Sequence, residues 1–437
     1  MITDLFWLAI LLCFFAFGLT RPHVALASVI WTDVLKPQDL SFSFLAGKPL
    51  SLIVTVFFLI SMLINFKKIK RPTNLSPTII LLFFIFWITI CNYYALFPIP
   101  AWFKYDFVIK TLVFCLFIPF VIQEKKHLEV VIGIFVASLS YYILTAGFRS
   151  ILGSGGYGVQ LVYTRAGDSG AAETSTLSML SVMIIPLIFY LIKYGESVKP
   201  NKIIKWILII TVLCGVASMV GTRARTGLVG FIALLAFFTY HYKHKMRIIL
   251  ALMLVAPLVY VNLPDDYVSR MNTIKSANDE SSALGRIVVW RWTIDFAKER
   301  PIFGGGFSSY MANAGQLGKY LDEGVWIDER GSTGKAFHSI YFETLGETGY
   351  VGLMTYLYII FMIWRLNLKS KRQSSEPSVQ SLAVALNLCL IVYCACGAFI
   401  GIAFAPWLYY ILGFSSALMT ISSAKATQLT VRPPLSS

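Results

Sequence analysis

The stretch SPTIILLFFIFWITICNYYALF, residues 76–97, contains no charged side chain and decides the fold class. An α-helix needs about 20 consecutive apolar residues to cross a bilayer, and this stretch supplies them. Similar runs recur along the chain of 437 residues, of which 57% are hydrophobic and only 14% are charged, with a mean hydropathy of +0.71. A soluble protein carries about 25% charged residues. We therefore predict an all-α polytopic membrane protein.

Short basic hinges separate the apolar runs and account for much of the net charge of +15. They comprise residues 67–71, 125–126, 193–205, 243–247 and 365–372. Short loops rich in Lys and Arg mark the cytoplasmic side of a membrane, so the charge indicates topology and not a nucleic-acid partner. All seven cysteines lie inside apolar runs, where they are expected to act as packing residues and not to form disulfides.

The hinges and runs together predict the number of spans. We expect spans near residues 49–66, 76–97, 104–123, 128–149, 171–192, 203–220, 226–240, 247–262, 349–366, 379–400 and 403–421. Residues 3–20 add one more, and residues 22–35 are short for a full crossing. This predicts twelve membrane-spanning helices, or thirteen if 22–35 also crosses.

The same pattern predicts four regions. They are an N-terminal bundle (1–262), a large outer loop (263–337), C-terminal membrane helices (338–421) and a polar cytoplasmic tail (422–437). The loop has balanced charge and contains three tryptophans, which argues against disorder. Within it, residues 285–299 have helical periodicity and the glycines at 304–306 indicate a turn.

The stretch AFHSIYFETLGETGYVG, residues 336–352, follows this loop and opens a membrane helix. His338 is placed at the outer surface, whereas the other four histidines lie near the start of the chain or in basic hinges. With an unperturbed pKa near 6.5, a histidine can act as a base at neutral pH. A lone histidine at a helix start is more often a cap or a surface residue. Glu343 and Glu347 are expected to pair with nearby arginines or to line a cavity.

Several arginines gather on the same outer side. Arg223 and Arg225 lie in the short turn GTRARTG, Arg286 and Arg291 in the helical part of the loop, and Arg165 in the loop near 150–170. Interfacial snorkelling is the plain interpretation, but the positive-inside bias disfavours two arginines in one short outer turn. Guanidinium groups bind phosphate in a bidentate manner. A phosphorylated or diphosphate substrate is therefore the expected partner.

Metal and nucleotide sites are not predicted. Four adjacent acidic pairs in the long loop have side chains that diverge, and nothing near them completes a hard-cation site. The segment GSTGKA, residues 331–336, lacks the spacer and the final Ser or Thr of a phosphate-binding loop. We expect neither a metal ion nor a cofactor.

These motifs resemble the O-antigen ligase family, which belongs to a wider group of ligases and polymerases acting on lipid-linked glycans. The pattern that carries the resemblance is His338-Ser339, nine residues, and then Gly349-x-x-Gly352. The turn GTRARTG looks like the family's Ser-Arg-Gly motif with Arg225 as its arginine, although Ala224 and Thr226 replace the usual serine and glycine.

Two further segments are similar to family regions. The segment SSALGRIVVWRW, followed by PIFGGGF, places Arg286 at the arginine of a Gly-Arg…Trp…Pro-x-x-Gly-x-Gly pattern. The opening segment LTRPHVALASVIW, residues 19–31, looks like the N-terminal region of exosortase-associated ligase-like members.

The resemblance implies a metal-independent, inverting glycosyltransferase of the membrane C class. Its donor would be an undecaprenyl-diphosphate-linked glycan and its acceptor a sugar hydroxyl of lipid A core, in lipopolysaccharide biosynthesis. The protein would be a multi-pass protein of the bacterial inner membrane, surrounded by membrane lipids, with a periplasmic active site formed in part by the large periplasmic loop.

The residue roles follow from the same resemblance and from charge. His338, Arg225 and Arg286 are the expected catalytic residues: the histidine takes the acceptor proton and the arginines stabilise the departing diphosphate. The expected weaker contacts to the diphosphate or glycan are Arg223, Arg165 and Arg291. The expected structural glycines, which allow a bend or close packing, are Gly346, Gly349 and Gly352.

Three alternatives stay open. A polymerase and a protein O-oligosaccharyltransferase use the same donor and differ only in the acceptor. A lipid-linked glycan transporter belongs to another class, and it would place charged residues along a path through the spans, where few are visible.

Overall fold

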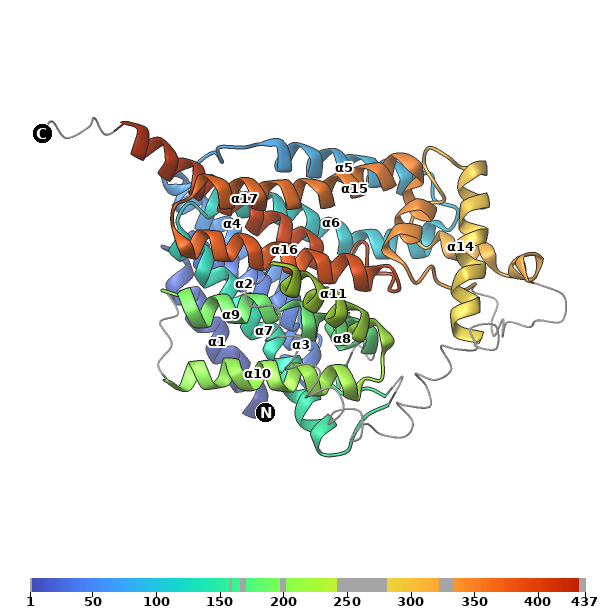
Figure 1. Cartoon of the computed structure of the whole chain (residues 1–437), viewed down its shortest axis with the longest axis horizontal. Helices are drawn as coiled ribbons and strands as arrows, with labels where there is room; N and C mark the ends of the chain where they lie inside the picture. Colours follow the sequence, from blue (N-terminus) through green and yellow to red (C-terminus); the bar gives the residue numbers. More distant parts are fainter. Residues whose placement is uncertain are drawn as a thin grey trace, which may run out of the picture.

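The computed structural model describes residues 2–156, 159–165, 170–196, 202–241, 281–321 and 334–431, and over these residues it contains helices and no strand (Figure 1). The first half contains α1 (Ile2–Gly18), α2 (Pro22–Leu35), α3 (Pro37–Leu40), α4 (Leu50–Ile64), α5 (Ser76–Tyr93), α6 (Pro98–Val121), α7 (Lys125–Ile151), α8 (Thr174–Met183) and α9 (Ile185–Tyr194). The second half contains α10 (Lys202–Gly221), α11 (Arg225–His241), α14 (Ser281–Glu299), α15 (Ile340–Gln373), α16 (Pro377–Gly397) and α17 (Pro406–Val431). Short 3-10 helices lie at Phe66–Lys68 (η1), Gly170–Ala172 (η2), Ser309–Asn313 (η4) and Leu317–Tyr320 (η5).

Most of the helices run side by side, and α14 lies across one end of them, on the right in Figure 1. We call this the α14 end. The opposite end, on the left, carries the basic hinges at Lys67–Arg71, Lys125–Lys126 and Arg365–Arg372, and we call it the basic end. This arrangement places the basic hinges and the helix predicted in the long loop at opposite ends of the bundle.

Among the described residues, six helices are long and apolar enough to cross a membrane: Ser76–Tyr93, Lys125–Ile151, Thr174–Tyr194, Lys202–Gly221, Ile340–Gln373 and Pro377–Gly397. Four shorter apolar helices, α1, α2, α4 and α11, accompany them. The all-helical membrane class is thereby confirmed, and the number of twelve or thirteen spans stays a prediction. The expected span at 247–262 lies outside the described residues.

The short helix α2 forms the centre of the N-terminal half. It has 14 residues, which corresponds to about 21 Å at 1.5 Å per residue, less than the hydrocarbon core of about 30 Å. It packs against α1, α4, α6 and α7 and is buried on nearly all faces. The helix ends at Lys36, which has a left-handed backbone (φ 49°), and Pro37 then starts α3. This geometry agrees with the expectation that 22–35 is too short for a full span.

Small residues allow close helix contacts in the bundle. Gly147 of α7 faces α10, where a Cβ added to it would stand 2.5 Å from Cβ of Cys214. Such close approach is typical of membrane helices, in which van der Waals packing replaces the hydrophobic effect.

The expected span 171–192 is divided into α8 and α9 at Ile184, just before Pro186, because proline cannot continue the hydrogen-bond ladder.

The long segment after α11 is described only in part. Residues 281–299 form α14, which agrees with the helical periodicity predicted for 285–299. The four acidic pairs of this segment fall at 242–280 and 322–333, outside the described residues.

The packing of α7 on α10 predicts the effect of filling the glycine. Gly147→Ala should destabilise the protein by about 1–3 kcal/mol, because the new methyl group cannot fit beside Cys214 without moving the helices. The readout is the apparent Tm of the purified protein in detergent. Gly318→Ala is the matched control, since nothing lies within 4 Å of its Cβ position. Equal Tm values for both variants would contradict the close contact.

Candidate active site

A break at Gly349 divides α15 and shapes the α14 end of the molecule. Gly349 has φ 69° and ψ −171°, a conformation that side chains other than hydrogen rarely adopt. A Cβ there would stand 2.2 Å from the carbonyl oxygen of Ile302. Beyond the break, the amide of Tyr350 donates to the carbonyl of Pro301 at 2.8 Å. The residues before Gly349 therefore form a separate arm of the helix.

The glycine run 304–306 lies against this break. The amide of Gly305 donates to the carbonyl of Gly346 at 2.8 Å, and that of Gly306 donates to the carbonyl of Glu347 at 3.0 Å. The carbonyl of Gly305 accepts in turn from the amide of Leu96 at 2.9 Å. The turn predicted at 304–306 thus fills the space between the arm of α15 and the end of α5.

The two other glycines of the motif lie in close contacts. A Cβ on Gly346 would stand 2.5 Å from the ring of Phe337, and one on Gly352 would stand 1.9 Å from Oγ1 of Thr348. The helix is thus kinked at Gly349 and closely packed at Gly346 and Gly352.

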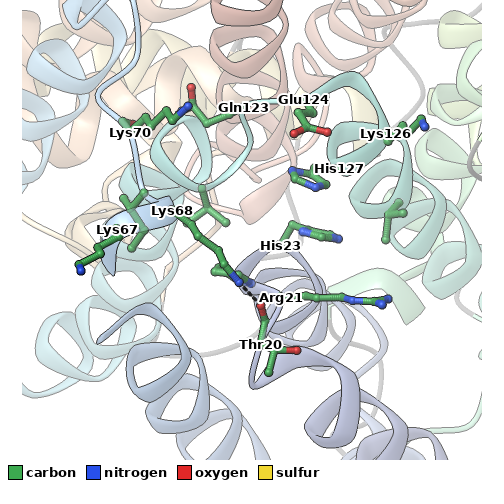
Figure 2. Close-up of a pocket in the computed structure, with 14 residues that line it drawn as sticks. Thr20, Arg21, His23, Lys67, Lys68, Lys70, Gln123, Glu124, Lys126 and His127 are labelled. Carbon is green, nitrogen blue, oxygen red and sulfur yellow. Dashed lines mark hydrogen bonds between the residues drawn. The ribbon is translucent and has the colours of Figure 1, made fainter. Parts of the chain in front are cut away.

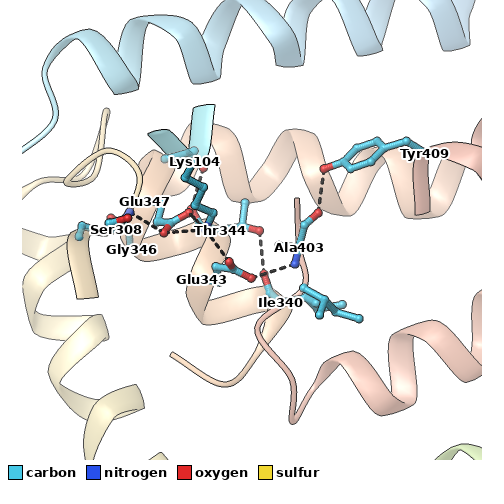
Figure 3. Close-up of polar contacts among 12 residues, drawn as sticks. Lys104, Ser308, Ile340, Glu343, Thr344, Gly346, Glu347, Ala403 and Tyr409 are labelled. Carbon is cyan, nitrogen blue, oxygen red and sulfur yellow. Dashed lines mark hydrogen bonds and ion pairs between the residues drawn. The ribbon is translucent and has the colours of Figure 1, made fainter. Parts of the chain in front are cut away.

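A buried charge cluster lies along the arm (Figure 3). Nζ of Lys104, on α6, is 2.7 Å from Oε1 of Glu343 and 2.8 Å from Oε2 of Glu347. The amide of Ala403 donates to Glu343 at 2.8 Å and that of Ser308 donates to Glu347 at 2.9 Å. Charge-assisted bonds of this kind join α6, the arm of α15, the loop at 301–308 and the loop before α17.

Lys104 was not singled out in the sequence, and the pairing differs from the expected one. Glu343 and Glu347 bind a lysine and not an arginine. The available signal was a lysine within a largely apolar segment, since a membrane segment tolerates a buried charge only beside a partner. The two glutamates, four residues apart on one helix face, needed that partner as well.

His338 directly precedes the arm and is held by its neighbours. Its backbone has φ 49°, in the left-handed region, which costs energy for a residue other than glycine. Nε1 of Trp290, on α14, donates to the carbonyl of Phe337 at 2.9 Å, and the Trp290 ring stacks on Phe342 at 5.0 Å. The side chain of Asn313 forms two hydrogen bonds with the backbone of Lys335. Its Nδ2 donates to the carbonyl at 2.7 Å, and its Oδ1 accepts from the amide at 2.8 Å. These contacts hold the strained turn in place.

Burial and the surrounding charges lower the pKa of the His338 imidazole below the usual 6.5. Burial is the main cause, and the positive charges of Arg286 and Lys335 add to it, while the carboxylates of Glu173 and Glu343 act in the opposite direction. The side chain is partly buried, and no described residue hydrogen-bonds its ring. A neutral imidazole beside two cations is suited to accept a proton close to a developing anion.

Arg286 lies close enough to His338 for its charge to lower the pKa of the imidazole. Lys335 joins it, and a Cβ added to Gly285 would stand 2.1 Å from Nζ of Lys335. Lys335 was not singled out, although it lies three residues before the histidine. Glu173, which caps α8 by accepting from the amides of Ser175 and Thr176, was also not singled out.

Arg225 is linked to His338 through α16. Arg225 is partly buried at the first residue of α11, and the carbonyl of the next residue, Thr226, accepts from Sγ of Cys396 at 3.2 Å. Beside Cys396, a Cβ on Gly397 would contact Ile340, which follows His338 by two residues. Both motifs thus lie at the same end of α16. The neighbouring Arg223 has a left-handed backbone, φ 50°.

Arg165 and Arg291 lie farther from this group. Arg165 is exposed, and its amide donates to the carbonyl of Asp39 at 2.8 Å, beside α3. Arg291 is exposed on α14, whereas Arg286 is partly buried. No contact in the described part of the chain joins either of these two arginines to His338.

No group of three or more His, Cys, Asp or Glu side chains in the described residues is placed to hold a metal ion. The absence of a metal from the reaction stays a prediction.

The fold and the charged groups at the α14 end define a multi-pass helical membrane protein with a polar site at one end of its helices. Residues 210–357 match the family described as O-Antigen ligase, so this region of the chain is similar to members of that family. Residues 2–196 match a family of unknown function, DUF5935. No curated protein matches the chain.

The match to the O-antigen ligase family includes most of the candidate residues. His338, Arg286, Arg225 and Lys335 all lie within 210–357, as does the break at Gly349. Arg165, Lys104 and Glu173 lie in the region of unknown function. The two regions of the chain therefore meet at the Lys104 cluster.

The cluster predicts a large difference between two lysines of α6. Lys104→Met should cost about 3–5 kcal/mol, because it leaves two buried carboxylates without their cation. Lys110→Met removes an exposed pair with Asp106 and should cost less than about 1 kcal/mol. The readout is again the apparent Tm in detergent.

A second substitution separates charge from packing. Adding Glu347→Gln to Lys104→Met removes one of the unpaired charges and should recover part of the lost stability. If the double variant is no more stable than Lys104→Met, the loss comes from packing of the lysine stem and not from unpaired charge.

Proposed function

We propose that this protein is an O-antigen ligase, an inverting and metal-independent glycosyltransferase that moves a glycan from undecaprenyl diphosphate onto a sugar hydroxyl of lipid A core. The observation that carries the proposal is the setting of His338, in which burial, together with the positive charges of Arg286 and Lys335, lowers the pKa of the imidazole. A base and two cations thus meet at one place, within the region that matches O-antigen ligases.

His338 acts as the general base. Because its pKa is lowered, the imidazole is neutral at pH 7 and accepts the proton of the acceptor hydroxyl. The hydroxyl oxygen attacks the anomeric carbon from the face opposite the diphosphate and forms the new glycosidic bond. The old bond between this carbon and the phosphate oxygen breaks, and its electron pair leaves with the diphosphate, so the configuration inverts.

Arg286 stabilises the negative charge that develops on the leaving diphosphate, and Arg225 and Lys335 assist it. Preorganised cations in a partly buried site are effective for this purpose, and no reorganisation of water is needed. Arg223, Arg165 and Arg291 are proposed as weaker contacts to the donor. Arg165 and Arg291 are exposed, which suits contacts to the more distant parts of the glycan.

The reaction takes place on the periplasmic side of the bacterial inner membrane. The basic end carries the short Lys- and Arg-rich hinges typical of the cytoplasmic side, so the α14 end faces the other way. No nucleoside triphosphate is available on the periplasmic side. The energy for transfer therefore resides in the diphosphate linkage of the donor.

Substitutions of the base and of an arginine test these roles. His338→Ala should abolish glycan transfer while the protein stays in the membrane. Arg286→Gln should lower kcat about 10²–10³-fold, the cost of losing one electrostatic contact to a transition state. Arg300→Gln, at the exposed end of the same helical segment, is the control and should keep full activity. Full activity of the His338→Ala variant would refute its role as base.

The acceptor is tested by reconstitution. The purified full chain in lipid nanodiscs receives a lipid-linked glycan donor together with either lipid A core or a second lipid-linked unit. Product on lipid A core, unchanged by EDTA, supports the ligase. Product only on the second lipid-linked unit identifies a polymerase, and loss by EDTA with recovery on adding Mg²⁺ overturns the metal-independent mechanism.

The pH dependence follows from the lowered pKa of His338. A base acts only when unprotonated, so kcat/KM should be constant near pH 7 and fall about tenfold per pH unit below a midpoint that lies under 6.5. The measurement is the initial transfer rate at low donor concentration from pH 5 to pH 8. A midpoint above 7 would contradict the effect of Arg286 and Lys335 on this histidine.

A further inference from the structure

A polar cavity lies at the basic end of the bundle (Figure 2). It has a volume of about 640 Å³ and lies among three segments: the turn at 20–23 between α1 and α2, residues 67–70 after α4, and residues 121–130 at the junction of α6 and α7. All of these residues belong to the region that matches a family of unknown function. The proposed glycosyl transfer does not use this cavity.

The cavity carries a large excess of positive charge. Its charged lining consists of Arg21, Lys67, Lys68, Lys70 and Lys126, against the single carboxylate of Glu124. No described carboxylate forms an ion pair with Arg21, Lys67, Lys68 or Lys70. By contrast, Lys125, next in sequence to Lys126, has Glu196 at 2.8 Å and Glu376 at 2.6 Å. An anion is therefore the ligand that this lining fits.

Several contacts hold the lining in position. Nζ of Lys68 donates to the carbonyl of Thr20 at 2.9 Å, and Nε2 of Gln123 donates to the carbonyl of Lys70 at 3.1 Å. The rings of His23 and His127 stack at 3.7 Å and join α2 to α7. These contacts bring together segments that are far apart in the sequence.

Two helix N-termini add to the positive potential. His23 lies in the first turn of α2 and His127 in the first turn of α7, and no side chain caps either helix by a hydrogen bond. The free amides and the helix dipole favour an anion at such a position. With the lysines and Arg21 around them, phosphate oxygens are the chemistry that the cavity can bind.

The surface beside the cavity is apolar and favours a lipid as the source of the phosphate. Phe17 and Leu19 lead into the turn at 20–23, and their exposed fractions are 56% and 40%. Leu63, Ile64 and Phe66 lead into Lys67, and their exposed fractions are 74%, 60% and 73%. Acyl chains can lie along these side chains while the headgroup enters the cavity. Free phosphate would gain nothing from them.

We propose that this cavity binds the phosphate of an anionic membrane phospholipid. The headgroup lies among Arg21, Lys67, Lys68 and Lys70, and the acyl chains follow the ends of α1 and α4. Each lysine or arginine near such a headgroup contributes about 1 kcal/mol. The bound lipid thereby joins α1, α2, α4, α6 and α7 at the basic end and stabilises the N-terminal half of the chain.

Binding of short-chain lipids to the purified full chain tests this proposal. Isothermal titration in zwitterionic nanodiscs compares dioctanoyl phosphatidylglycerol, dioctanoyl phosphatidylcholine and inorganic phosphate. The test variant is Lys67→Gln with Lys70→Gln, which leaves the Lys68 contact intact. The matched control is Lys369→Gln with Arg372→Gln, which removes two exposed cations of α15 outside the cavity.

The proposal predicts a saturable phosphatidylglycerol site that phosphatidylcholine fills at least tenfold more weakly. The Lys67→Gln/Lys70→Gln variant should lose about tenfold or more in affinity, and the control should keep the affinity of the unmodified chain. Equal weakening in both variants would show a general surface effect and overturn the site. Inorganic phosphate that binds as tightly as the lipid and competes with it would overturn the lipid as the ligand.

Discussion

The docking of residues 301–306 on the broken helix α15 is the constraint on which the α14 end depends. A helix break leaves backbone groups without their usual partners, and in apolar surroundings each unsatisfied group costs several kcal/mol. The loop supplies those partners, since Gly305 donates to Gly346 and Tyr350 to Pro301. The break and the loop therefore require each other. Because α14 leads directly into this loop, its position, and with it that of Arg286, depends on the same contact.

Charge is balanced differently on the two sides of the helix arm that follows His338. On one side, Lys104 pairs with the carboxyl groups of Glu343 and Glu347. On the other side, Arg286 and Lys335 act on the histidine and lower its pKa. A Cβ on Gly401 would lie 3.6 Å from both the His338 amide and Oε2 of Glu343, which shows how little separates the two sides. The proposed base thus lies between groups that pull its pKa in opposite directions.

Cations have two distinct functions in this chain. Lys104 and Lys125 join helices, because each is surrounded by carboxylates inside the bundle. The cations around His338 and around the basic cavity face ligands instead, a donor diphosphate at one end and a lipid phosphate at the other in our proposals. The two sites lie in regions that match different families, so the ligase region and the N-terminal region can be tested separately.

The sequence by itself determined the helical membrane class, the approximate bounds of most helices, the helix near 285–299 and the bend at the motif glycines. These features follow from local properties, namely the length of apolar runs, periodicity and the freedom of glycine at positive φ. Only the tertiary structure decided that Lys104 pairs with Glu343, 239 residues away, and that Trp290 holds the carbonyl before His338. Such pairs depend on which helix faces meet, and many arrangements of the same apolar helices bury similar surface. The break at Gly349 favours one of them, because its backbone groups find partners in the 301–306 loop, Ser309 and Trp87.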